Sequence, residues 1–293
     1  MRRLIMACCL LLCLPLQAEQ RIVLSASQDS VAVRAFTAAL AQRRPQDQVS
    51  FMPLDSLRQA PEGTATHLVS LDAEVLRWRL AHPGGPATLA MRISRVEGHA
   101  LFGERPHPGI TLLWSDPPAA RQLRLARLLL PGARRVGLLY DEQSAFLVEE
   151  YRQAAQALQL ELDARAWSPG GNRRPLLALL ENNDLLLGLD APRLYNAQTI
   201  KSLLLTSYAQ QRPLLGPTAG FVRAGSLASS YSDQQDWLET LDRLLAQPPS
   251  SWPEAAYPSH FKVVSNRQVA RALGLAAPAD AELTRQLSEG ETP

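Results

Sequence analysis

The stretch Leu128–Tyr140, with the sequence LLLPGARRVGLLY, contains the pattern that decides the fold. An amphipathic run ends at Pro131-Gly132, and a short basic link then leads into the apolar segment 136–140. The turn residues and the change of periodicity predict a helix that feeds a buried parallel strand. This strand begins a second cycle of strands and helices, since the first half of the chain has already run through one. We therefore predict two α/β lobes in series, with the functional site between them.

The length and composition of the chain are compatible with a two-lobed α/β protein and exclude several other classes of protein. The chain has 293 residues, enough for two ordinary domains with well-formed cores. Its moderate charge and ordinary apolar content exclude a disordered chain and a multispanning membrane protein. Lysine and arginine total 30 against 28 acidic residues, but Arg2 and Arg3 lie in a segment that we expect to be removed. The remaining chain is then neutral, which argues against a nucleic-acid partner.

The N-terminus has the pattern of an export signal. Residues 1–3 are basic at two positions, segment 4–16 is a short apolar run, and Ala18 offers a small residue before a cut. The apolar run is too short to cross a bilayer comfortably. We therefore expect residues 1–18 to be a signal peptide cleaved after Ala18, which places the mature protein in the periplasm without stable membrane insertion.

All three cysteines, Cys8, Cys9 and Cys13, lie inside this signal segment. The mature chain is then expected to have no disulfide, no thiolate nucleophile and no cysteine-ligated metal. Cys8 follows a sequence that faintly resembles a lipoprotein cleavage box, although little hydrophobic sequence precedes it. Cleavage after Ala18 is the interpretation we prefer to lipidation at Cys8.

Alternating apolar runs and capping residues predict the other elements. In the first half the strands are expected at 21–27, 49–54, 67–71, 87–93 and 110–114, with a turn-rich loop before the last of them and a helix at 117–130. In the second half they are expected at 136–140, 160–167, 184–189, 213–216, 226–231 and 261–264. Helix caps are predicted at Asp72, Asn196 and Asn266, and a capping box at Ser232 with Gln235. Segment 220–225 is expected to be irregular, and residues 276–293 a loosely held tail.

The predicted strand ends carry a set of polar side chains. In open parallel α/β sheets the ligand crevice lies beyond the carboxyl ends of the strands, and helix N-termini there favour carboxylates and other anions. Asp and Glu at the same edge would suit an ammonium group. Many of these residues would also serve as plain helix caps, so we expect about half to touch no ligand. The candidate ligand-binding residues are Ser25, Ser27, Asp29, Ser70, Asp72, Tyr140, Glu142, Ser144, Asp190, Tyr195, Asn196 and Thr218.

Catalytic patterns are missing from the sequence. The five histidines are scattered without metal-ligand spacing, and His67 inside an apolar strand is interpreted as a core residue. Ser226 lies in AGSLA and not in a nucleophile elbow, and no phosphate-binding loop pattern surrounds Gly170-Gly171. We therefore predict a protein that is not an enzyme, with no catalytic residues, no metal and no cofactor. An exported hydrolase or transferase is the alternative that this absence disfavours.

Three stretches together resemble a known family. They are LARLLLPGARRVGLLYDEQS, YNAQTIKSLLLTSYAQQRPLLGPTAGFVRAGSLASSYSD and FKVVSNRQVARALGLAAP. In order and spacing they are similar to the solute-binding proteins of an ABC-transporter family that includes tryptophan-binding members. The resemblance covers nearly the whole mature chain and is strongest from Leu123 onward.

This resemblance implies a type I periplasmic-binding-protein fold, in which two Rossmann-like lobes are joined by hinge strands and close on a small solute. It places lobe 1 at residues 19–132 and 224–250, lobe 2 at 133–223 and 251–280, and a flexible tail at 281–293. The family's ligand loops fall on 25–29 and 70–72 in the first lobe. In the second lobe they fall on 140–144, 190–196 and 217–220.

Two departures from the family pattern lie in the first-lobe half of the expected cleft. They are Ser70-Leu71-Asp72, where relatives have a Gly- or Thr-rich loop, and the proline-containing segment 103–109. The family's aromatic ligands are therefore not carried over. The expected function is capture of a small amino-acid-like, anionic or zwitterionic solute for an inner-membrane ABC permease. The alternative is a sensory module of the same fold that signals to a membrane receptor or kinase.

Overall fold

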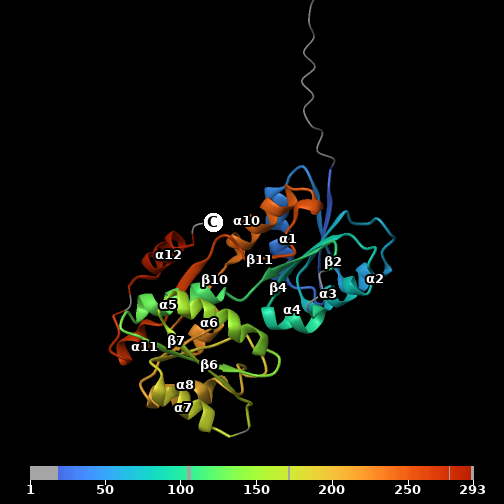
Figure 1. Ribbon diagram of the computed structural model, residues 1–293. Helices are drawn as coiled ribbons and strands as arrows, with labels where there is room; N and C mark the ends of the chain where they lie inside the picture. The colour runs from blue at the N-terminus through green and yellow to red at the C-terminus, as the bar shows by residue number, and fades with distance from the viewer. Residues whose placement is uncertain (1–18, 104–106, 171, 277, 292–293) are drawn as a thin grey trace, which may run out of the picture.

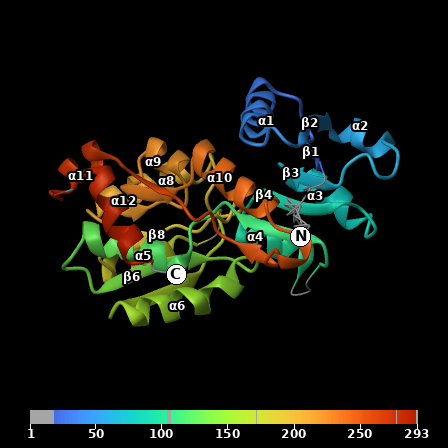
Figure 2. The ribbon, with the colours of Figure 1, turned by 90° about the horizontal axis from the view of Figure 1, so that it is seen from above.

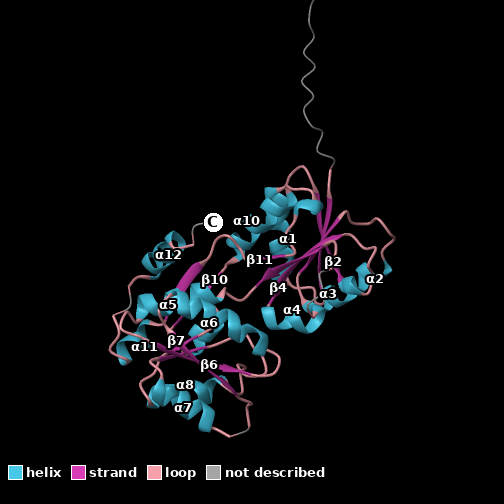
Figure 3. Cartoon of the chain, viewed as in Figure 1, coloured by secondary structure: helices cyan, strands magenta, loops and turns pink. Residues whose placement is uncertain are grey.

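The structure is a computed structural model that describes residues 19–103, 107–170, 172–276 and 278–291. The expected signal peptide, residues 1–18, lies outside the described residues. Figure 1 shows two lobes, and Figure 3 shows a separate set of strands in each of them. The described strands form a six-stranded sheet, a four-stranded sheet and a two-stranded ladder. The prediction of two α/β lobes with parallel sheets is thus confirmed.

The first lobe is built on the six-stranded sheet, with the strand order β11-β5-β4-β3-β1-β2 and parallel pairing throughout. Because parallel strands end at the same edge, the loops after β1, β3 and β4 leave the sheet beside one another. The strands are β1 (Arg21–Ala26), β2 (Gln48–Pro53), β3 (His67–Ser70), β4 (Ala87–Ile93), β5 (Ile110–Trp114) and β11 (Ala255–Ala256).

Helices cover both faces of this sheet. On one face α1 and α10 bury Leu40 and Leu241 against Leu24 of β1. On the other face α2, α3 and α4 enclose two smaller clusters that contain Leu57 and Leu76. The helices are α1 (Val31–Arg43), α2 (Leu54–Gln59), α3 (Ala73–Leu80), α4 (Arg95–Phe102) and α10 (Gln234–Leu245), and a 3₁₀ turn, η2 (Pro249–Ser251), follows α10.

The second lobe is built on the strand order β7-β6-β8-β9, again with parallel pairing. Gly137 lies in β6, and a Cβ there would be 2.8 Å from Cδ2 of Leu186, so glycine permits the close packing of the neighbouring leucines. The strands are β6 (Arg135–Tyr140), β7 (Glu161–Ala166), β8 (Leu185–Leu187) and β9 (Leu214–Leu215), with β10 (Ala228–Tyr231) antiparallel to β12 (Lys262–Ser265).

One large apolar core holds the helices of this lobe to its strands. Figure 2 shows α5, α6 and α12 gathered near β6. The helices are α5 (Ala119–Leu129), η1 (Ala145–Leu147), α6 (Val148–Ala157), α7 (Arg174–Asn182), α8 (Ile200–Ala209), α9 (Ala219–Ala224), α11 (Arg267–Ala272) and α12 (Asp280–Glu289).

Helix α5 corrects the expected lobe boundary. Residues 119–132 were expected in lobe 1, but Leu123 and Leu125 are buried in the same core as Val136 and Leu138 of β6. The apolar stripe of α5 therefore packs on the strand that follows it. The chain passes from one lobe to the other before α5 and not after it.

Two later segments, 224–231 and 251–256, also belong to the opposite lobe from the one expected. Leu227 and Ala228 belong to the second-lobe core, and the N–H of Leu227 donates to the carbonyl of Leu214 next to β9. Trp252 and Ala256 pack against the first-lobe core, since β11 pairs with β5. Segment 224–231 thus belongs to the second lobe, and segment 251–256 to the first.

Several local predictions were wrong. Segment 281–289 is not a flexible tail, because α12 buries Leu283 and Leu287 in the second-lobe core. No helix was predicted directly after the strand at 87–93, where α4 lies, and the segment 220–225 that was expected to be irregular lies largely in α9. The capping box of α10 is Asp233 with Asp236, not Ser232 with Gln235.

Within the described residues the chain crosses between the lobes at 115–118, 232–233 and 257–261. Two crossings are tied together, because the Ser232 hydroxyl donates to the carbonyl of His260 at 2.8 Å. The ammonium of Lys262 also lies 2.6 Å from a carboxylate oxygen of Asp233. Among the described residues, no helix has the length and apolar character needed to cross a bilayer.

Candidate functional site

The predicted residues of the first lobe lie together at the ends of β1 and β3. Ser25 and Ser70 are register partners in the sheet and are fully buried. Beyond them, the N–H and the hydroxyl of Ser27 donate to one carboxylate oxygen of Asp72, at 2.6 and 2.8 Å. The other oxygen of Asp72 accepts from the first N–H groups of α3, as the predicted cap. Ser27 and Asp72 therefore form one rigid polar unit at the sheet edge.

Asp29 lies in the same loop but already has a partner. The Arg34 side chain forms an ion pair with Asp29, and Nε of Arg34 donates to Oδ1 at 2.8 Å. The hydrogen bonds from Arg34 hold the pKa of Asp29 below its ordinary value. Both side chains are exposed on the first turn of α1. A ligand would have to compete with Arg34 for this carboxylate.

A hollow of about 310 Å³ lies at the ends of β3 and β4, beside the first turns of α1 and α10. Arg92 lines it and has a φ of 62°, where the pairing of β4 with β5 is irregular. Non-glycine residues in this conformation are uncommon and gather at functional sites. The Arg92 side chain is exposed, and it makes no hydrogen bond or ion pair with the described residues. Arg92 is thus a free cation at the tip of the first-lobe sheet.

The first predicted loop of the second lobe is closed on itself. Ser144 is fully buried, and its hydroxyl donates to Oδ1 of Asp141 at 2.7 Å. Glu142, in the same turn, is exposed, and Tyr140 is half-buried at the end of β6. Ser144 therefore shapes the turn, whereas Glu142 and Tyr140 remain accessible.

The next two loops of this lobe carry the other predicted residues. Asn196 accepts from the N–H groups of Gln198 and Thr199, so it caps a turn and not α8, whose N-cap is Thr199. Tyr195 is buried against Phe221, with ring centroids 6.2 Å apart. Thr218 stands at the N-cap of α9 and is partly exposed.

A group of residues that the sequence analysis did not select joins the two lobes. The guanidinium of Arg95, in the first turn of α4, lies 2.9 Å from Oε2 of Glu150 in α6 and donates to the hydroxyl of Tyr257 at 2.9 Å. The backbone N–H of Arg95 donates to Oδ1 of Asp116 at 2.8 Å. Arg95 therefore contacts the second lobe and two of the crossing segments.

Two buried or partly buried carboxyl groups near the crossing segments have raised pKa values. Burial, and then the charge of Asp190, raise the pKa of Asp116 to about 7. Burial, and then the charge of Glu97, raise the pKa of Asp190 to about 6. Glu97 follows β4 in the first lobe and Asp190 follows β8 in the second, so the charge that raises the pKa of Asp190 comes from the other lobe. Asp190 makes no hydrogen bond or ion pair with the described residues.

Several solved structures have a similar overall architecture. A substrate binding protein with adhesive properties from Clostridium difficile, in its ligand-free, open form, is similar with a TM-score of 0.70 and 12% identity over 89% of this chain and 97% of that one. A conserved domain protein from Vibrio cholerae has a TM-score of 0.61 and 16% identity, over 90% and 98% of the two chains.

The third is an ABC domain from Streptococcus pneumoniae in complex with L-Trp, with a TM-score of 0.58 and 17% identity over 88% of this chain and 96% of that one. The fold is that of a type I periplasmic binding protein. No protein-family model matches the sequence, and the comparison with curated proteins gives no match either.

The sequence analysis missed Arg92 near the end of β4, Arg95 in the first turn of α4, and Asp116 in a segment that crosses between the lobes. The signal for α4 was present, because Ser94 and Glu97 have the S-x-x-E spacing and form a capping box in the structure. Asp116 also follows its strand closely, as Asp72 and Asp190 follow theirs. The same rule that selected those residues would have found it.

Proposed function

We propose that this chain is an exported solute-binding protein of an ABC transporter, which captures a small zwitterionic solute between its two lobes and delivers it to an inner-membrane permease. The observation that carries the proposal is the contact of Arg95, which closely follows β4, with Glu150 of the second lobe and with Asp116 and Tyr257 of the crossing segments. This contact brings the end of a first-lobe strand against the second lobe, and ligands of parallel sheets bind beyond the strand ends. The similar solved structures, which include substrate-binding proteins, agree with this role.

Free charges of both signs favour a zwitterion over a simple anion. Arg92 offers an unpaired guanidinium at the first-lobe hollow, which suits a carboxylate. Asp190 offers an unpaired carboxyl whose pKa is raised, and an ammonium group would stabilise its charged form. A solute with one carboxylate and one ammonium group could satisfy both and so connect the lobes.

Among the residues predicted from the sequence, Ser27, Asp72, Tyr140, Glu142, Asp190 and Thr218 keep the proposed role, because each is at a strand end and is not fully buried. Ser25, Ser70, Ser144 and Tyr195 are buried, and they act in the proposal as supports of the loops. Asp29 and Asn196 have local partners. Arg92 and Asp116 join the proposed site.

The lobes would close because the solute binds the closed arrangement more tightly than the open one. A solute that touches one lobe in the open arrangement and both lobes in the closed one shifts the population toward the closed state. Arg95 would serve as the pivot of this motion, since it stays bonded to Tyr257 in a crossing segment and to Glu150 in α6.

The test is a thermal-shift screen of the purified protein with amino acids, amines and organic acids, followed by calorimetry of the compounds that stabilise it. A zwitterion is expected to raise the melting temperature, and matched compounds that lack either charge should do so less. Arg92→Gln should weaken binding about tenfold or more, since it removes a charge-assisted hydrogen bond.

Arg77→Gln is the matched control, because Arg77 is an exposed arginine on α3 without a hydrogen bond or ion pair to the described residues. Its affinity should equal that of the parent protein. If none of the compounds stabilises the protein, or if Arg77→Gln weakens binding as much as Arg92→Gln, solute capture at this site is refuted.

A further inference from the structure

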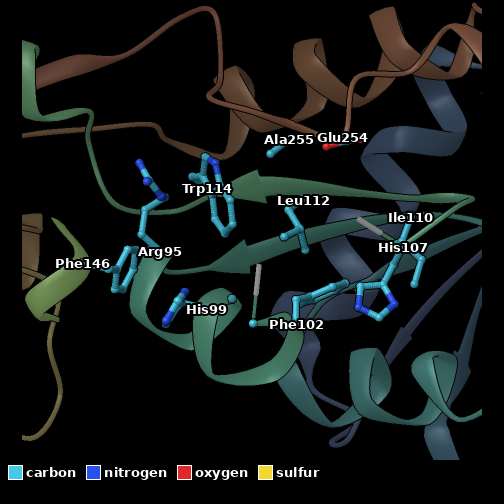
Figure 4. A pocket seen from close by; sticks show the side chains of 12 residues that line it. Arg95, His99, Phe102, His107, Ile110, Leu112, Trp114, Phe146, Glu254 and Ala255 are labelled. Atoms are coloured by element: carbon cyan, nitrogen blue, oxygen red, sulfur yellow. The ribbon is translucent and has the colours of Figure 1, made fainter. Parts of the chain in front are cut away.

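A second cavity lies on the flank of the first lobe, along the face of the sheet and not at the strand tips. Its volume is about 420 Å³, and it lies between α4, the strands β5 and β11, and Phe146 of the second lobe. Figure 4 shows Leu112 and Trp114 of β5 directed into it, with α4 on the opposite side. We call it the flank pocket, and its principal lining residues are Arg95, His99, Phe102, Trp114, Phe146 and Glu254.

The pocket exists because α4 approaches the sheet closely at one point. A Cβ on Gly98 would lie 2.5 Å from Cζ3 of Trp114, so the indole rests directly on the glycine. Farther along β5, the apolar side chains of Ile110 and Leu112 also line the pocket (Figure 4). The volume falls within the range of about 300 to 1,000 Å³ that is usual for small-molecule sites.

Flat rings make up much of the wall. His99 stacks on Phe146 with centroids 4.0 Å apart and an interplanar angle of 18°. His107 meets Phe102 edge-on at 4.5 Å, and the indole of Trp114 completes the set. Because aromatic faces favour stacked and edge-on partners, this wall fits a planar aromatic ligand.

The charge of the pocket is negative. Arg95 lines it at the Trp114 end, where its guanidinium lies 5.5 Å from the centroid of the indole and is neutralised by Glu150 at 2.9 Å. Glu254 lines it too, and its exposed carboxylate makes no hydrogen bond or ion pair with the described residues. The negative faces of the rings attract cations as well. An occupant with a positive charge would therefore meet both an unpaired carboxylate and several ring faces.

We infer that the flank pocket is a binding site for a planar aromatic cation, separate from the proposed solute site. The ring would lie against Trp114 and Phe102, and its cationic group would reach Glu254. Since Phe146 belongs to the second lobe, an occupant would touch both lobes beside the hinge. The shape and charge of the flank pocket do not depend on whether the protein also carries a solute at the strand ends.

The experiment compares three probes of nearly equal shape: benzamidinium, neutral benzamide and benzoate. Binding is followed by ¹⁹F NMR of protein labelled with 5-fluorotryptophan, in which the Trp114 resonance is assigned from Trp114→Phe. Benzamidinium should shift this resonance and bind about fivefold more tightly than benzamide, the size of one exposed charge pair with a ring contribution. Benzoate should bind most weakly.

Substitutions separate the flank pocket from the carboxylates at the strand ends. Glu254→Gln should lower the affinity for benzamidinium to that for benzamide, whereas the matched control Glu181→Gln, at an exposed glutamate of α7, should not change it. Phe102→Leu should weaken both probes. An unmoved Trp114 resonance, equal affinity for the three probes, or a loss caused by Asp190→Asn in place of Glu254→Gln would overturn the inference.

Discussion

The buried carboxyl of Asp116 offers the most direct test of the electrostatics beside the hinge. Burial and the neighbouring charge of Asp190 raise its pKa from an ordinary value of 3.8 to about 7. Asp116→Asn removes the charge but keeps a carbonyl oxygen that can accept the N–H of Arg95, which lies 2.8 Å from Oδ1. We predict that this variant is more stable than the parent protein at neutral and alkaline pH.

The magnitude follows from proton linkage. A raised pKa means that the folded state holds its proton at pH values where the unfolded state has released it. The parent protein therefore loses stability, relative to the variant, as pH rises from about 4 to about 7. Each pKa unit corresponds to about 1.36 kcal/mol, so the full difference is on the order of 4 kcal/mol. Asp116 is only 8% exposed, and solvent screening reduces this figure little.

The assay is urea unfolding followed by circular dichroism between pH 4 and pH 8, with the parent protein and Asp116→Asn compared at each pH. The two proteins should have nearly the same free energy of unfolding near pH 4, and the variant should be more stable by several kcal/mol at pH 8. A difference in unfolding free energy that does not change with pH would refute the reasoning.

Three further outcomes can be measured on the same protein. Gly137→Ala should cost roughly 1 to 3 kcal/mol in urea unfolding, because its Cβ meets a buried leucine of β8, whereas Gly132→Ala, which has open space, should be nearly neutral. Asp184 accepts from the N–H groups that begin β6, and these bonds lower its pKa despite the opposing effect of burial. Asp184→Asn should therefore destabilise the protein at pH 7, and the loss should fade as pH falls through the acid range; a loss independent of pH would contradict this. Asp190→Asn should lower the apparent pKa of Asp116, measured by NMR titration, since one neighbouring charge is removed.

The sequence predicted the alternation of elements well, because apolar runs and caps are local signals. The strand predicted at 136–140 is present as β6, and the caps at Asp72 and Asn266 are confirmed by their hydrogen bonds. The partition of the chain between lobes was less accurate. Which side of a helix meets which sheet depends on contacts between distant residues, and α5 shows that a helix can join the lobe that follows it.

The expectation that ligand-binding residues follow the carboxyl ends of the strands does not tell which of these side chains point outward. Ser25 and Ser144 satisfy this expectation and yet are buried, because alternation along a strand and the closure of a turn decide their direction. Arg92 was not selected by it, since its left-handed backbone conformation leaves no sign in the composition of the strand. Asp116 follows the end of β5 by two residues, so its position could have been predicted from the sequence.

Closure of the two lobes on a bound solute can be followed by single-molecule energy transfer between dyes on the two lobes. The described residues contain no cysteine, so Arg58→Cys on α2 and Glu181→Cys on α7 would give one dye on each lobe. We predict that the zwitterion that stabilises the protein shifts the population to higher transfer efficiency, and that Arg92→Gln requires a higher concentration for the same shift. Saturating binding of that compound with no change in transfer efficiency would contradict the claim.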